Sequence, residues 1–334
     1  MIFKDFFIRD MEADTYRETF LISAIVSIFA IRVFLKFTNY PILGVGDIHV
    51  AHMLWGGLFM MAAIIISLSF LSKTASNIAA LLGGIGFGAF IDELGKFITS
   101  DNDYFFRPTV AFIYIIFVLV YLISRVIPYR RMSKKEYLVN AIETIKESAI
   151  NDFDVEEERR AKAYLRKCDP DDPTVHALKK LLSHIDAAPM PPPGIFTRIK
   201  IFMRNVYYTL AGSGIVVNVI IAFLAVQAVL TLSQLFPLFT HRPSLRFSEW
   251  GMLYSSILAG TFALIGLFAL RVSKEEGYRF FRLSMLITIL LTEFFAFMRS
   301  QWYEVIGLAF NLFILAVINY AMIQEKQKNK AETA

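Results

Sequence analysis

GGIGFGAFIDELGKFITSDNDYFFRP, residues 83–108, is the stretch that decides the fold. It begins as a glycine-rich apolar segment and then places Asp92, Glu93 and Lys96 within that segment. Ionisable side chains inside a membrane helix are costly and usually functional. The stretch therefore predicts a membrane helix that carries a polar cluster near one end, where the chain leaves the bilayer through Asp101 and Asp103.

The composition agrees with a membrane protein. Apolar residues make up 56% of the 334-residue chain and charged residues 19%, whereas a soluble chain has roughly 45–50% and about 25%. The net charge of +5 comes from basic residues beside the apolar blocks, so it indicates no nucleic-acid partner. The single cysteine, Cys168, excludes an intrachain disulfide and a cysteine-cluster metal site.

The apolar blocks are long enough to cross a bilayer, which takes about 20 residues. They predict an all-α, polytopic integral membrane protein with about eight transmembrane helices and a small helical cytoplasmic insert. The predicted spans cover residues 20–37, 48–71, 76–98, 108–127, 215–236, 250–270, 281–298 and 305–322.

The charge pattern divides the chain into four parts. Residues 1–127 form a four-helix membrane unit, and residues 128–193 form the insert with its Pro-rich linker. Residues 194–323 comprise an interfacial helix and a second four-helix unit, and residues 324–334 form a charged tail. Within the insert, Asp172 followed by Pro173 is typical of a helix start. Residues 195–210 mix basic and apolar side chains, as in a helix that lies in the membrane surface.

Basic residues predict the orientation of the spans. Most Lys and Arg between and after the spans fall on the same side as the insert, and this side is expected to be cytoplasmic. The prediction is a multi-pass protein of a bacterial plasma (inner) membrane, with both termini cytoplasmic and the lipid bilayer as its first partner.

The predicted topology gathers polar residues at the outer face. His49 and His52 are three residues apart and begin the second span, close to the end of the third. Gly84 and Gly88 lead at four-residue spacing to Asp92, and such a stripe of small residues lets a neighbouring helix approach closely. Gly56 and Gly57 of the second span are the expected counterparts of the stripe.

Two chemistries suit this cluster. His49 and His52 with Asp92 could supply three ligands to zinc and leave a position for an activated water. Without a metal, a His–carboxylate pair could act as a general base. The candidate catalytic residues are His49, His52, Asp92, Glu93 and Lys96, and the candidate substrate-binding residues are Arg107, Asp101, Asp103 and Arg32.

Other interpretations of the same residues stay open. The cluster could be a salt-bridge network, Asp92–Lys96 and Glu93–Lys96, that fixes helix register, or it could couple to ions or protons. Arg32 could reach the membrane surface or face a carboxylate in the bundle. Glu293 is a further intramembrane carboxylate, and Arg32, Arg299 and Lys96 are its candidate partners.

The motifs DIHVAHMLWGGL, FIDELGKFIT and DNDYFFRP resemble an uncharacterised family of bacterial multi-pass membrane proteins. More distantly, they are similar to the VanZ-like and YjdF-like membrane families. The chain differs from the VanZ-like pattern at Lys96, near where a Gln would be expected. The resemblance implies a membrane fold and a functional motif, but no reaction.

Three functions follow as hypotheses. The first is a membrane-embedded hydrolase that acts on a lipid or lipid-linked phosphate substrate, with zinc as a candidate cofactor. The second is a proton- or ion-coupled transporter in which Glu93 and Glu293 exchange protons. The third is a non-catalytic partner subunit that docks other proteins through the insert.

Overall fold

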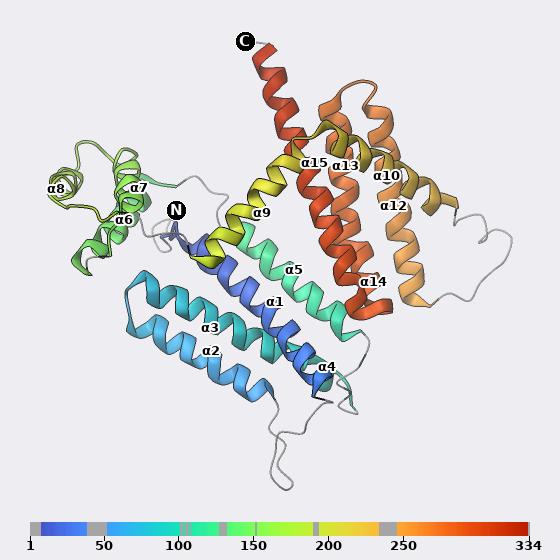
Figure 1. The fold of residues 1–334 in the computed structure, drawn as a ribbon, viewed down its shortest axis with the longest axis horizontal. Coiled ribbons are helices and arrows are strands. Elements are labelled where there is room, and N and C mark those ends of the chain that lie inside the picture. The colour runs from blue at the N-terminus through green and yellow to red at the C-terminus, as the bar shows by residue number, and fades with distance from the viewer. Residues whose placement is uncertain are drawn as a thin grey trace, which may run out of the picture. The chain divides into compact units, whose positions relative to one another are not determined.

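Helices make up most of the fold (Figure 1). The computed structural model describes residues 8–38, 52–100, 103, 106, 108–126, 132–150, 152–189, 194–233 and 246–332. Within these ranges no residue belongs to a β-strand, and one isolated bridge joins Asp154 to Ala188. The predicted all-α fold is therefore confirmed.

Seven helices in the described ranges are long and apolar enough to cross a membrane. An eighth predicted span corresponds to α5 (Thr109–Val126), whose apolar part is shorter. The chain is thus a polytopic helical membrane protein. The seven are α1 (Ala13–Phe37), α2 (His52–Ser69), α3 (Lys73–Asp92), α10 (Gly214–Ser233), α12 (Phe247–Ala269), the continuous run of α13 (Lys274–Ile287), η3 (Thr288–Thr292) and α14 (Glu293–Ser300), and α15 (Glu304–Glu332).

The chain forms two compact units. The first contains Met1–Phe97 and Leu119–Pro192, and the second contains Ile98–Val118 and Pro193–Ala334, so the division falls within α5. The four parts assigned from the sequence stay a prediction.

In the first unit, glycines bring α1 and α2 against α3. A Cβ atom on Gly88 would lie 2.3 Å from the carbonyl oxygen of Ala24 in α1, and one on Gly84 would overlap Ser23. The glycine stripe therefore packs against α1, whereas α2 was the expected partner. The α2 contact is made by Gly86, whose added Cβ would lie 2.5 Å from the carbonyl oxygen of Gly56.

The insert contains α6 (Lys134–Ile145), η2 (Lys146–Ile150), α7 (Val155–Leu165) and α8 (Pro173–Leu182). The side chain of Asp172 caps α8 and Pro173 is its first residue, as the sequence predicts. Capping boxes begin α6 and α7. The insert has its own small core, formed by Ala141, Ile145, Phe153, Ala161, Leu165, Cys168, Val175 and Leu182.

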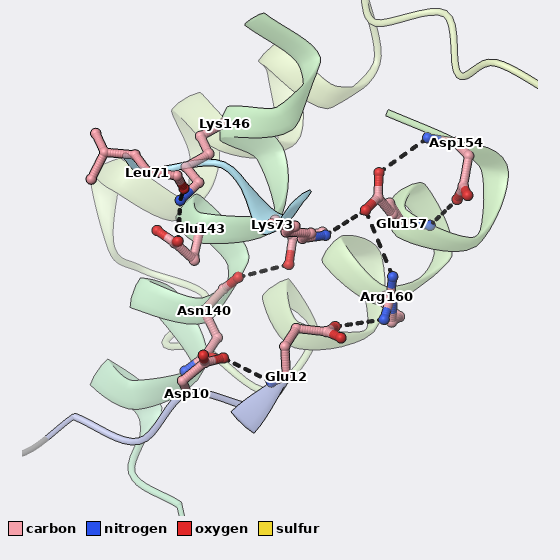
Figure 2. Close-up of polar contacts among 11 residues, drawn as sticks. Asp10, Glu12, Leu71, Lys73, Asn140, Glu143, Lys146, Asp154, Glu157 and Arg160 are labelled. Carbon is pink, nitrogen blue, oxygen red and sulfur yellow. Dashed lines mark hydrogen bonds and ion pairs between the residues drawn. The ribbon is translucent and has the colours of Figure 1, made fainter. Parts of the chain in front are cut away.

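Ion pairs attach the insert to the membrane helices of the first unit, as Figure 2 shows. Lys73, the first residue of α3, pairs with Glu157 of α7. Arg160 of α7 pairs with Glu12 at 2.5 Å, just before α1. Because Lys73 begins α3 and Glu12 directly precedes α1, the insert contacts the N-terminal ends of both helices.

The segment before α1 is bound along α6. Arg9 donates to both carboxylate oxygens of Glu136, at 2.9 and 3.1 Å. The side chain of Asn140 forms two hydrogen bonds with the backbone of this segment. Its amide nitrogen donates to the Arg9 carbonyl and its amide oxygen accepts from the Met11 N–H, each at 2.8 Å. These bonds order a segment that has no helix of its own.

The core of the second unit lies among α10, α12, α13 and α15, around Phe281, Met285 and Ile314. Tyr207 attaches α9 (Ile195–Ala211) to α15 by donating to the Ala316 carbonyl at 3.0 Å. Tyr114, in the first part of α5, donates to the carbonyl oxygen of Ile289. That carbonyl belongs to η3, a π-helical segment, and such segments often occur at functional sites.

Candidate functional site

Three of the predicted site residues meet at one end of α2 and α3. His52, the first residue of α2, lies with its Nδ1 3.1 Å from Glu93 Oε1 and its Nε2 3.3 Å from Asp92 Oδ2. Asp92 is fully buried and Glu93 is 1% exposed. One imidazole thus lies between two buried carboxylates.

Two cations complete the arrangement. The Arg32 Nε lies 2.6 Å from Asp92 Oδ1, and its guanidinium also donates to the Asp92 carbonyl at 3.3 Å. The Lys96 Nζ lies 3.0 Å from Glu93 Oε1. The order Arg32–Asp92–His52–Glu93–Lys96 defines what we name the charge cluster. Of the two ion pairs predicted for Lys96, the structure shows the one with Glu93. Asp92 forms an ion pair with Arg32.

A break in the helix lets the carboxylates of two consecutive residues, Asp92 and Glu93, contact the same side chain. Consecutive residues of an α-helix point about 100° apart and do not face a common partner. Here α3 ends at Asp92, Glu93 has φ −87° and ψ 6°, and α4 (Leu94–Ile98) begins after it. The two carboxylates therefore reach opposite nitrogens of the same imidazole ring.

The cluster has two natural charge states. A neutral imidazole has one N–H donor, so it can donate to only one of the two carboxylates, whereas an imidazolium can donate to both. Histidine is the side chain that most readily changes charge near neutral pH. Each nitrogen of the His52 ring therefore has a carboxylate oxygen nearby.

The remaining predicted residues are not placed in the charge cluster. His49, Asp101 and Arg107 lie outside the described residues. Asp103 belongs to the second compact unit, where its backbone N–H donates to the Thr99 hydroxyl at 2.8 Å. In the described ranges no three His, Cys, Asp or Glu side chains are placed to hold a metal ion. The zinc site, which needs His49, stays a prediction.

A second buried carboxylate lies in the second unit. Glu293 is 5% exposed, and its Oε1 accepts from the Asn311 side chain at 2.6 Å. Arg32 and Lys96 pair with other carboxylates, and Arg299 is exposed. None of the three candidate cations is therefore seen as its partner. Asn311 was missed, although a lone Asn inside an apolar span is a signal of such a contact.

No family model, no curated protein and no solved structure matches this chain.

Proposed function

We propose that this protein is a proton-coupled membrane transporter, in which His52 carries the proton in the first unit. The observation that carries the proposal is the position of the His52 ring, on α2, between two buried carboxylates at the end of α3. Histidine–carboxylate groups inside membrane bundles are typical of proton relays in pumps and transporters.

The same geometry weighs against the hydrolase hypothesis. A general base needs a ring nitrogen directed at the substrate, and both nitrogens of His52 face carboxylates. Arg32 and Lys96, the candidate phosphate-binding groups, already pair with Asp92 and Glu93. Hydrolysis would require the cluster to open, whereas proton exchange requires only one proton to enter it.

We further propose that the protein resides in a bacterial plasma membrane with both termini in the cytoplasm. The basic residues that follow the even-numbered spans support this orientation. The insert would then be cytoplasmic.

The test is charge movement driven by a pH step. The full-length protein is reconstituted in liposomes on a solid-supported membrane, and the transient current is recorded without any solute. We expect a current above that of empty liposomes, reduced by about tenfold or more in His52→Gln because glutamine cannot change charge. A panel of solutes added on one side then identifies the co-transported class.

His176→Gln is the matched control, because His176 is exposed on α8 of the insert. It should keep the wild-type current. A folded His52→Gln protein with an unchanged current would exclude His52 as the proton carrier. A wild-type protein without pH-driven current, but with zinc-dependent release of phosphate from a lipid pyrophosphate, would establish the hydrolase instead.

A further inference from the structure

The second unit contains buried oxygen atoms that the proposed proton step does not use. Glu293 Oε2 and Thr292 Oγ1 are both buried, and neither has a hydrogen-bond partner among the described residues. They belong to consecutive residues, at the junction of η3 and α14. A buried polar atom without a partner is costly and calls for an explanation, such as a bound water or ion.

The backbone at this junction is π-helical. The Glu293 N–H donates to the carbonyl of Thr288, five residues earlier, where an α-helix would use a residue four earlier. Such π-helical turns inside α-helices occur frequently at functional sites. Thr292 and Glu293 therefore lie where the backbone departs from α-helical geometry.

Carboxylates from two helices meet here at a glycine. A Cβ atom on Gly307 would lie 3.9 Å from Glu293 Oε1 and 3.6 Å from Glu304 Oε2. No ion pair from a described residue neutralises either carboxylate, in contrast to Asp92 and Glu93 in the first unit. Asn311 donates its amide nitrogen to Glu293 and keeps its amide oxygen for another contact. The donor set is thus oxygen-rich and negatively charged.

We propose that Glu293 and Asn311 bind an alkali cation of the sodium class within the second unit. The hard oxygen donors suit such an ion. Glu293 is the buried carboxylate of this donor set, and its single negative charge balances one positive charge. This favours a monovalent ion, since Mg²⁺ demands octahedral ligands and retains its waters. The site is separate from the charge cluster and goes beyond the proton-coupled function.

The test is direct binding of radioactive sodium to the full-length protein in lipid nanodiscs, measured without any gradient. Saturable binding of about one ion per chain is expected, competed by excess sodium. Glu293→Gln should reduce the affinity by about tenfold or more, because it removes the charge and keeps an oxygen for Asn311.

Glu276→Gln is the matched control, because Glu276 is an exposed carboxylate of α13 in the same unit. It should bind sodium as the wild type does. The proposal is overturned if the folded wild-type protein binds no sodium between about pH 6 and pH 9, or if Glu293→Gln binds it unchanged. Since binding is measured at equilibrium, a failure of the His52 proton step would not alter the result.

Discussion

Glu136 shows how a single side chain fixes a segment outside the membrane. The side-chain hydrogen bond from Arg9, together with the backbone N–H of Ser133, lowers the pKa of Glu136 from 4.5 to about 2. Because the folded pKa lies below the unfolded one, this bond stabilises the attachment at pH values above about 4.5. The stabilisation is lost as the pH falls from there towards about 2.

We therefore expect Glu136→Gln to weaken the attachment of residues 8–12 at neutral pH, by about 2 kcal/mol. Hydrogen exchange of the full-length protein, corrected for the intrinsic rate at each pH, measures this. The mutant should exchange faster at pH 7, and the difference should vanish at the acidic end of the window. Glu158→Gln, which breaks a surface pair with Lys162, should change little. Wild-type protection in Glu136→Gln would contradict the assignment.

The residues of the charge cluster and the Glu93–Lys96 pair could be predicted from the sequence, but the pairing of Arg32 and His52 could not. An ionisable residue in an apolar block is visible as such, so Asp92, Glu93 and Lys96 stand out. The partner of Arg32 depends on how α1 is rotated against α3, and no local pattern records that rotation. The bridging role of His52 depends on the turn at Glu93, which the apolar periodicity of the segment conceals.

At the scale of helices, close backbone contact explains the arrangement around α3. A methyl group on Gly88 would lie 2.3 Å from the Ala24 carbonyl oxygen, whereas one on Gly57 meets no atom within 4 Å. Gly88→Ala should therefore force α1 and α3 apart and cost about 2 kcal/mol or more. Gly57→Ala should be neutral or stabilising by up to about 1 kcal/mol, because alanine favours the helix.

Reversible unfolding of both variants in detergent micelles measures the two free energies. Since Gly88 lies one turn before Asp92, Gly88→Ala should also reduce the pH-driven current. Equal stability of Gly88→Ala and Gly57→Ala would show that the α1–α3 contact is looser than described.

The spans could be predicted because membrane helices must satisfy their own backbone in lipid, which leaves long apolar blocks in the sequence. Which helix packs against which could not be predicted from the sequence. The glycines were expected to meet α2, but Gly84 and Gly88 meet α1, and Gly86 meets α2. A stripe of small residues shows that some helix comes close without identifying it.

For the whole molecule, contacts of the insert limit the topology. Residues 9–12 bind α6 and α7, so the start of α1 and the insert lie at the same membrane face. The chain between them must cross the membrane an even number of times. The helices α1, α2 and α3 supply three crossings, and α5 is the described apolar helix that can supply the fourth.

We therefore expect reporters placed in the α7–α8 turn and after α15 to lie on the same side. Green fluorescent protein, which matures in the cytoplasm, should fluoresce at both positions, and alkaline phosphatase, which needs export, should be inactive at both. A reporter in the α3–α5 connection should show the reverse pattern. Opposite results at the α7–α8 turn and after α15 would rule out eight spans.

The attachment of the insert has a consequence for biosynthesis. Arg9 leaves the ribosome 127 residues before its partner Glu136, an interval of about 6–25 s at ordinary translation speeds. During that time the first helices enter the bilayer while residues 9–12 lack their contacts with α6 and α7. Once α6 and α7 have been translated, they can form their ion pairs with the residues before α1 and with Lys73 at the start of α3. A truncated or stalled chain without these helices would lack the ion pairs that Arg9, Glu12 and Lys73 form with the insert.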